Sequence, residues 1–508
     1  MRSVGGALEI GLHDPGMTTL HRAGLAGLWM TLERAKADPE AQALRGLGSW
    51  RLERDAVRLE WEDEAFFPRL FHYAYPITPR GLMSLALLGD PDARRAEVCA
   101  FHNGLLDTFL QHPKSRKLGG PTRHEAFKVE GQQQLVPYRP IADHRFRWEG
   151  FSPDRPQPVA GWLLPGGVVR HYVHAGPTSL EEPPGRALAL RFGPAGCGYF
   201  LVHQRRREGT RTYRTAVVVP EVRDLERYAR HACGRFPAQL EELSTAGPAE
   251  AALRFLTLLH ADDEQDDLEV AGCQVLGFTT LAWSPQQRVR AYVLSTREAD
   301  RGQLQRYGHI RRHLAPQVRR RADGDTWLDV PQVPELAAEN LLHRRPWWHD
   351  FATWTADPRL RQHVIGFESR GLNRMLNDET VTPEADAQTF VRACHEAWRR
   401  RLGQLGERAR DQGLSPESLA QRERERLRAA LARCKTQADF RACITDLWAR
   451  AGYLRTLQQS WVQILPFLDR RWRAGRDLAL LALASYRSEP SDDAEAAETS
   501  AAETSRGV

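Results

Sequence analysis

Long apolar runs are missing from this sequence of 508 residues. No stretch approaches the roughly 20 uncharged apolar residues that a membrane-spanning helix requires. The first residues also have no apolar core of the kind found in signal peptides. The sequence therefore predicts a cytoplasmic protein with no membrane partner. Its 42% of apolar and 27% of charged residues are the proportions of an ordinary globular protein.

Paired cysteines are missing as well. The seven cysteines are scattered and odd in number, and no CxxC pair occurs. This pattern indicates neither a disulfide framework nor a zinc site built from thiolates. We therefore expect no metal and no other cofactor.

Common catalytic signatures are absent too. The sequence has no GxxxxGK[ST], no GxSxG and no HExxH. The pair His349–Asp350 is typical of HD phosphohydrolases, but that chemistry needs further His and Asp ligands, and the flanking aromatic residues favour packing. The acidic run at 262–269 does not have the spacing of an EF-hand loop. The sequence therefore favours a protein that is not an enzyme, and an undetected hydrolase or nuclease is the catalytic alternative.

Lysine is rare, and its placement is uneven. The chain has five Lys against 66 Arg, and three of the five lie between 114 and 128. Residues 388–487 hold nineteen Arg and one Lys against ten acidic residues, whereas the tail at 488–508 holds six acidic residues against one Arg. The net charge of +6 therefore hides a strongly basic C-terminal region.

Turn and capping signals divide the first two thirds of the chain into short elements. A strand at 8–12, a turn at Asp14–Pro15–Gly16 and a helix from about Thr18 are predicted first. Alternation of apolar and polar residues predicts more strands, and steps of three or four predict a helix. The strands are at 50–61, 159–173, 187–192, 198–203 and 213–219, with the last three in a meander, and the helix is at 93–111.

Helical periodicity dominates from about 336 onward. Three apolar stripes predict a bundle. They are Phe390, Cys394, Trp398, Leu402 and Leu405; Phe440, Ile444, Leu447, Ala451 and Leu454; and Trp461, Leu465 and Leu468. The predicted fold class is α+β. We expect a mixed helix and strand domain at 1–335, a helical domain at 336–490 with the bundle at about 384–487, and a disordered acidic tail at 491–508.

The first candidate nucleic-acid site is a basic loop at 112–150. Adjacent glycines let backbone amides approach phosphates, and the cations supply charge for a nucleic-acid backbone. Its candidate residues are Lys114, Arg116, Lys117, Arg123 and Lys128. The alternative is a solvated surface loop.

Two further Arg clusters are candidates of the same kind. Arg205, Arg206, Arg207 and Arg211 lie between two predicted strands, as in a hairpin tip. The triplet Arg399–Arg400–Arg401 has no acidic neighbours in the sequence, whereas the run at 422–428 is interleaved with Glu and is typical of a salt-bridged helix surface. A solvated surface is the alternative for both clusters.

The segment at 15–32 is the most distinctive part of the sequence. Two glycines in a predicted helix interior cost stability, so a close approach by another backbone is their simplest explanation. The motif residues are Gly16, His21, Arg22, Gly24 and Gly27. This segment resembles the N-terminal motif of Myxan-subtype large subunits of type I CRISPR Cascade complexes, a group that includes a protein of fruiting-body development.

The resemblance implies a non-catalytic scaffold. Such large subunits bind guide RNA and target DNA, contact other Cascade subunits, read a short motif beside the target and recruit a helicase-nuclease. Base pairing then supplies the sequence specificity. The resemblance also implies a role in fruiting-body development and sporulation. The alternative is a developmental regulator that binds DNA or protein without a guide RNA, although no helix-turn-helix is apparent.

Overall fold

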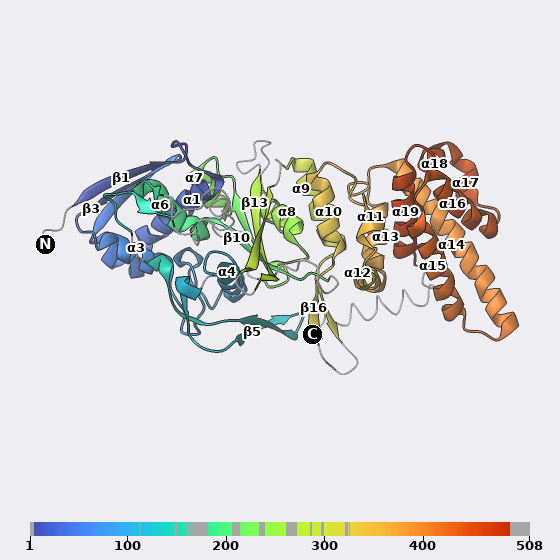
Figure 1. The fold of residues 1–508 in the computed structure, drawn as a ribbon, viewed down its shortest axis with the longest axis horizontal. Coiled ribbons are helices and arrows are strands. Elements are labelled where there is room, and N and C mark those ends of the chain that lie inside the picture. Colours follow the sequence, from blue (N-terminus) through green and yellow to red (C-terminus); the bar gives the residue numbers. More distant parts are fainter. Residues whose placement is uncertain are drawn as a thin grey trace. The chain divides into compact units, whose positions relative to one another are not determined.

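Strands and helices alternate through the first two thirds of the chain, and consecutive helices follow (Figure 1). In this computed structural model the chain forms two units, 1–345 and 346–508. The mixture confirms the predicted α+β class. The structure describes residues 5–111, 113–147, 151–159, 163, 181–205, 214–232, 239–260, 272–284, 287–295, 299–320, 324 and 326–487.

The first unit begins with a three-stranded antiparallel sheet in the order β1-β3-β2. Its strands are β1 (Gly6–Gly11), β2 (Gly48–Leu52) and β3 (Ala56–Trp61). Leu59 of β3 pairs with Leu8 of β1 and with Trp50 of β2. The helix α1 (Thr19–Ala37) follows β1 after a turn, so the predicted order of strand, turn and helix is confirmed.

Helix α1 is buried against α6 (Pro184–Phe192) and the short helix η5 (Gly193–Gly196). A Cβ atom at Gly24 would lie 1.9 Å from the carbonyl oxygen of Ala189, and one at Gly27 would lie 2.5 Å from that of Phe192. No side chain fits at either distance. The structure thus supplies a packing reason for both glycines.

The other motif residues lie around the start of α1. Gly16 has a φ of +86°, which favours glycine, and it lies against the Arg186 side chain. Nδ1 of His21 accepts a hydrogen bond from the Thr18 backbone N–H at 3.3 Å, and the ring is buried. Arg22 lies 3.9 Å from a carboxylate oxygen of Glu221. The segment is therefore a packing and capping motif in this unit.

One predicted strand is wrong, because residues 187–192 lie in helix α6. Pro184 stands in the first turn of α6, where its missing N–H costs nothing. Every residue from Ala187 to Phe192 is buried, so the apolar period that separates a helix from a strand is hidden. The predicted strand at 159–173 lies outside the described residues except for positions 159 and 163.

A five-stranded sheet in the order β12-β10-β11-β13-β14 forms the centre of this unit. Strands β10 (Gly198–Val202) and β11 (Thr215–Pro220) are antiparallel, and β11 pairs next with β13 (Cys273–Ser284). Its edges are β12 (Ser244–Thr245) and β14 (Gln287–Ser295). Helices α4 (Arg95–Asp107) and α8 (Pro248–Leu259) pack on it. The strands predicted at 198–203 and 213–219 are confirmed.

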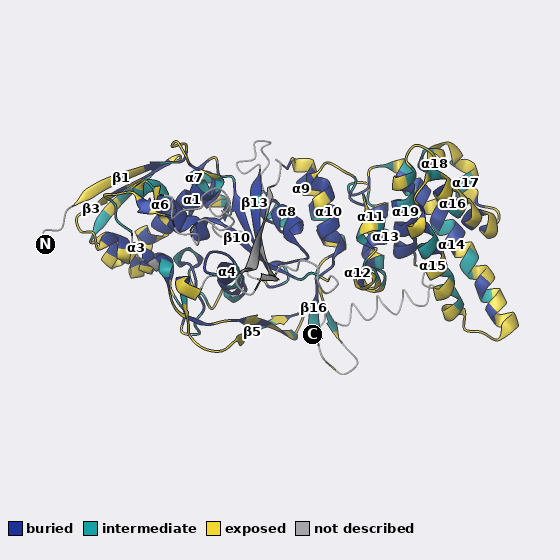
Figure 2. Ribbon diagram, in the orientation of Figure 1, coloured by how far each residue is buried: buried dark blue, intermediate teal, exposed yellow. Residues whose placement is uncertain are grey.

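The second unit is helical in its described part. The long helix α14 (Ala385–Gln412) ends at Gly413, whose φ of +61° turns the chain into α15 (Pro416–Arg433). Both helices pack against α19 (Trp472–Ser485), which is buried over most of its length. Helix α16 (Gln437–Ala451) also packs on α14. Figure 2 shows buried residues gathered where these helices meet.

The first two predicted stripes are largely confirmed. Phe390 and Trp398 of α14 and Phe440 and Ile444 of α16 are all buried. The third stripe is wrong at two of its three residues. In α18 (Trp461–Leu468) the residues Ile464, Phe467 and Leu468 are buried, whereas Trp461 and Leu465 are exposed. Because every residue of α18 except Gln463 is apolar, its sequence could not show which face is inward.

A substitution tests the close approach of α1. We expect Gly24→Ala to destabilise the protein by about 1–3 kcal/mol, because the new methyl group meets backbone atoms that cannot move aside. Urea denaturation followed by circular dichroism measures the change. Gly403→Ala in α14 is the control, since nothing lies within 4 Å of its added Cβ; it should be neutral or stabilising by about 1 kcal/mol. Equal stability of the two variants would contradict the packing argument.

Buried histidines make stability depend on pH. Nδ1 of His102 accepts from the Met83 N–H at 2.9 Å and Nε2 donates to the Arg139 carbonyl at 2.8 Å, so the ring is held neutral. Burial lowers the pKa of His102 to about 4, from 6.5. A lowered pKa means that the unfolded chain takes up a proton first, and stability is lost as pH falls from about 6.5 through 4. Burial raises the pKa of Glu335 to about 8. The stability that this group contributes is instead lost as pH rises towards and through 8.

Comparing the wild-type chain with a variant at this one position therefore isolates the contribution of His102 to the pH dependence of stability. We expect the stability advantage of the wild-type chain over His102→Gln to shrink by about 2 kcal/mol between pH 7 and pH 5. Urea denaturation at several pH values measures this gap. The exposed His72 serves as the control, and His72→Gln should keep a constant gap. A pH-independent gap for His102→Gln would refute the prediction.

Candidate nucleic-acid interface

The segment predicted as one basic loop, 112–150, is built from strands in most of its described part, 113–147. Strands β5 (Arg123–Val129) and β6 (Gln132–Tyr138) form an antiparallel hairpin. Strand β4 (Arg116–Leu118) pairs with β7 (Ile141–His144). Charged residues and three consecutive Gln hide the strand pattern in the sequence. The basic residues are therefore carried on defined strands.

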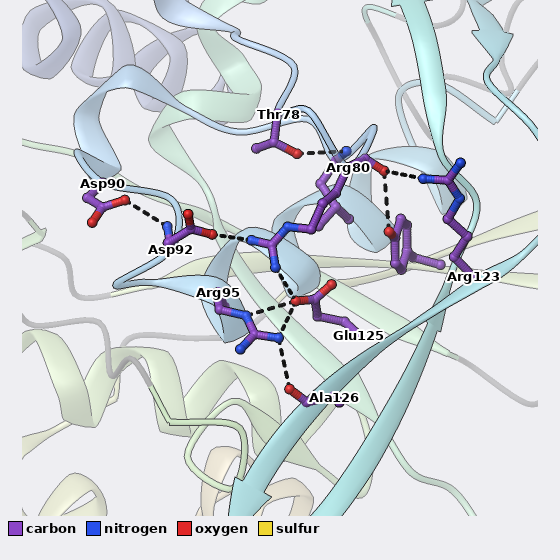
Figure 3. Close-up of polar contacts among 10 residues, drawn as sticks. Thr78, Arg80, Asp90, Asp92, Arg95, Arg123, Glu125 and Ala126 are labelled. Carbon is purple, nitrogen blue, oxygen red and sulfur yellow. Dashed lines mark hydrogen bonds and ion pairs between the residues drawn. The ribbon is translucent and has the colours of Figure 1, made fainter.

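A buried carboxylate anchors the β5–β6 hairpin, residues 123–138 (Figure 3). Glu125 is only 4% exposed and accepts from Nη1 of Arg80 at 2.6 Å and from Nε of Arg95 at 2.8 Å. Arg95 also donates to the Ala126 carbonyl at 2.9 Å, and Arg80 also pairs with Asp92. Two guanidinium groups on one carboxylate thus tie β5 to α4 and to the loop before it.

The base of the hairpin has a second anchor. The carbonyl oxygen of Arg80 accepts from Nη1 of Arg123 at 3.4 Å and from the hydroxyl of Tyr138 at 3.3 Å (Figure 3). Arg123 and Tyr138 are opposite each other in the register. Both strands are therefore attached to the same backbone group.

The outer face of the hairpin follows from its register. His124 lies opposite Pro137 and Lys128 opposite Gln133, and all four are exposed. Leu135 on the same face is 60% exposed. The hairpin therefore presents a polar surface with a cation and one apolar side chain.

A groove runs beside this hairpin. It has a volume of about 700 Å³ and is lined by Phe127, Lys128 and Gln133 of the hairpin, by Arg95 of α4 and by residues 239–241. The guanidinium carbon of Arg95 lies 5.5 Å from the centre of the Phe127 ring. Cations and an aromatic surface at one groove suit a nucleic-acid backbone and its bases. Sequence reasoning missed Arg80 and Arg95, and only their position before and within the helix at 93–111 could have suggested a part in this site.

The basic residues predicted around β4 have two different positions. Nη1 of Arg116 donates to the Leu106 carbonyl at 3.0 Å and also to that of Leu110, near the end of α4. Burial and the nearby Arg139 lower the pKa of Arg116. Lys114, Lys117 and Arg139 are exposed. Arg116 therefore supports α4, and the surface charge comes from its neighbours.

The predicted Arg cluster at 205–211 falls largely outside the described residues. Arg206, Arg207 and Arg211 are not described. Nη2 of Arg205 lies 3.0 Å from Oδ1 of Asp329, and its backbone N–H donates to Gln332 at 3.0 Å. The position of Arg205 is thus set by an internal ion pair.

The triplet Arg399–Arg400–Arg401 lies on α14 in the second unit. Nη2 of Arg401 lies 3.1 Å from a carboxylate oxygen of Glu423 on α15, a partner 22 residues away. Arg426 and Arg401 lower the pKa of Glu423 to about 2. Arg399 and Arg400 are exposed. The structure therefore separates two surface cations from one that links two helices.

The pair His349–Asp350, considered above as a catalytic candidate, lies in the second unit. Nδ1 of His349 lies 3.1 Å from Oδ2 of Asp350. No group of three or more His, Cys, Asp or Glu that could hold a metal ion occurs among the residues that the structure describes. In the same part of the chain, no helix is long and apolar enough to cross a membrane.

Comparison with known proteins finds relatives along most of the chain. Residues 9–191 match the DevT N-terminal domain family, and residues 378–507 match the DevT C-terminal domain family. The chain is 30% identical over 526 aligned positions to the CRISPR-associated protein Cas8a1/Csx13 of Myxococcus xanthus (strain DK1622). That alignment covers 96% of this chain and 90% of the relative. The resemblance expected from residues 15–32 is confirmed.

The anchoring of the hairpin is testable. We expect Glu125→Ala to raise amide hydrogen exchange across 123–138, because Arg80 and Arg95 lose the carboxylate that holds β5. Hydrogen exchange with mass spectrometry measures it. The control is Glu60→Ala on the exposed face of β3, which should leave the hairpin unchanged. Unchanged exchange in Glu125→Ala would show that other contacts hold the hairpin.

Proposed function

Because the chain belongs to the family of the CRISPR-associated protein Cas8a1/Csx13, we propose that it is the large subunit of a type I CRISPR Cascade complex. The observation that carries the proposal is the alignment over 96% of the chain together with matches to both DevT domain families. The subunit works in the cytoplasm as a scaffold and not as an enzyme. Its partners are guide RNA, target DNA, other Cascade subunits and a helicase-nuclease.

The β5–β6 hairpin is the proposed contact to duplex DNA beside the target. Its exposed cations, Arg123 and Lys128, together with Lys117 on β4, bind phosphates, while the anchored base fixes their position. Base pairing with the guide supplies sequence specificity, so the protein reads only shape, backbone and a short motif. Arg116 supports this surface by joining β4 to the end of α4.

The helical unit is a second proposed contact. Arg399 and Arg400 on α14 bind the backbone of a single strand or of the guide–target heteroduplex. Arg205, Arg206, Arg207 and Arg211 remain a predicted contact of the same kind.

The family match also favours a developmental role. The resemblance of residues 15–32 implies a part in fruiting-body development and sporulation, and the chain matches both DevT domain families. A regulator that binds DNA without a guide RNA is therefore the second candidate. Specific DNA binding by the isolated chain would favour this second role, and assembly with guide RNA favours the first.

Co-expression tests the main proposal. The full-length chain, the guide RNA and the other subunits of the complex are expressed together and purified through one tagged subunit. We expect the chain to co-purify with the RNA. A stable complex that lacks the chain would overturn the proposal, and so would turnover of DNA by the purified chain alone.

Charge reversal tests the duplex contact. We expect Lys117→Glu with Lys128→Glu to weaken duplex binding by the complex. The slope of log affinity against log salt concentration should fall in magnitude by about two, because the loss of two phosphate contacts reduces the number of counterions released on binding. Fluorescence anisotropy at several salt concentrations measures both. Lys36→Glu is the control, because Lys36 is an exposed cation on α1 that pairs with Glu33. An unchanged slope in the double variant would remove the hairpin from the contact.

A further inference from the structure

Four large apolar side chains are exposed within residues 453–465 of the second unit. Tyr453 is 57% exposed, Trp461 42%, Val462 84% and Leu465 43%. Tyr453 precedes the short helix α17 (Arg455–Gln459), and the other three stand on α18. We call these four residues the apolar face.

The core does not require the apolar face. The buried side of α18 is already supplied by Ile464, Phe467 and Leu468, and α18 packs on α14 and α19. Gln463 is the one polar residue of α18, and a helix as apolar as this is normally buried over most of its surface. A contiguous exposed apolar patch marks an interaction site, and Trp is frequent at the centre of protein interfaces. Some partner is therefore expected to cover this side of α18.

Positive charge borders the apolar face. The guanidinium carbon of Arg400 lies 5.8 Å from the centre of the Tyr453 ring, and Arg455 is exposed on α17. Residues 455–468 contain no Asp or Glu. The carboxylate of Glu396 accepts from the backbone N–H groups of Arg455 and Thr456 at 2.8 and 2.9 Å, so it is turned to the start of α17. The border is therefore cationic and complementary to acidic residues.

The charge and the side-chain types select one kind of partner. A symmetric contact with a second copy of the chain would bring two sets of Arg residues into one interface, and residues 455–468 offer no acidic residue to pair with them, which opposes association. Single-stranded nucleic acid stacks on aromatic rings along a basic groove, but Val462 and Leu465 offer neither a ring nor a charge. A helix that carries an apolar stripe between acidic residues fits both properties.

We propose that the apolar face binds such an amphipathic, acid-flanked helix on another protein subunit of the same assembly. This inference rests on the proposed function, because it takes the partner from the complex. Val462 and Trp461 form the centre of the contact, and Arg455 pairs with acidic residues at its edge.

Site-specific photo-crosslinking in the co-expressed complex identifies what covers the face. We expect p-benzoylphenylalanine at position 462 to crosslink one protein subunit, at a peptide that has apolar residues flanked by Asp or Glu. Mass spectrometry of the crosslinked peptide measures this. The same group at Gln421, an exposed residue of α15, is the control and should not give that product.

A matched pair of substitutions measures the strength of the contact. We expect Val462→Asp to lower retention of the crosslinked subunit by at least about tenfold, because a carboxylate is placed in the apolar centre. Gln463→Asp adds the same charge at the next exposed position of α18 and should retain the subunit. Native mass spectrometry reports the subunit stoichiometry, and thermal unfolding checks that both variants are folded.

The outcomes separate this inference from the function on which it rests. If the wild-type assembly does not form with guide RNA, the proposed function fails and this inference fails with it. If the assembly forms but position 462 crosslinks RNA, DNA, a second copy or the chain's own residues 488–508, only this inference is overturned. Crosslinking to no partner, or full retention of all subunits in Val462→Asp, overturns it as well.

Discussion

The first unit depends on how closely α1 approaches the backbone of α6 and η5. Gly24 and Gly27 remove the side chains that would keep these segments apart. The end of η5 leads directly into β10, which lies inside the five-stranded sheet, and α4 packs on β10 and β11. Arg95 at the start of α4 then holds the β5–β6 hairpin. The position of the proposed DNA contact is therefore linked, through packed elements, to two positions that must be glycine.

Arginine serves the inside of this protein more than its abundance suggests. Arg80, Arg95, Arg116 and Arg401 all bind carboxylates or backbone carbonyls of the chain. The planar guanidinium group has several fixed donors and is less strongly hydrated than an ammonium group, so it suits partly buried positions. The Lys side chain is a compact, hydrated charge and suits the surface, where Lys117 and Lys128 are exposed. A count of cations along the sequence therefore overestimates the charge that is available to a nucleic acid.

The sequence predicted features whose signal is local. The turn and cap before α1, the strands at 198–203 and 213–219 and the stripe of α14 all depend on spacing within one element. Prediction from the sequence failed where the contact that decides the structure is made with residues far away in the sequence. Residues 187–192 are buried on every side, α18 is apolar except at Gln463, and Glu423 is 22 residues from Arg401. Periodicity cannot choose a face when both faces are apolar, and a search of neighbouring residues cannot find an ion pair between helices.

The β5–β6 hairpin is held by polar contacts in addition to its buried Val129, Val136 and Tyr138. A two-stranded ribbon is marginally stable by itself in water. This one is held at its base by two guanidinium groups on the buried Glu125 and remains exposed along its outer face. Salt screens charges at the surface strongly and buried pairs much less. Because the outer cations are exposed and Glu125 is not, rising salt should release a bound nucleic acid while the hairpin stays in place. The same anchor therefore keeps the contact surface ordered whether or not its partner is bound, which lowers the entropy that binding must overcome.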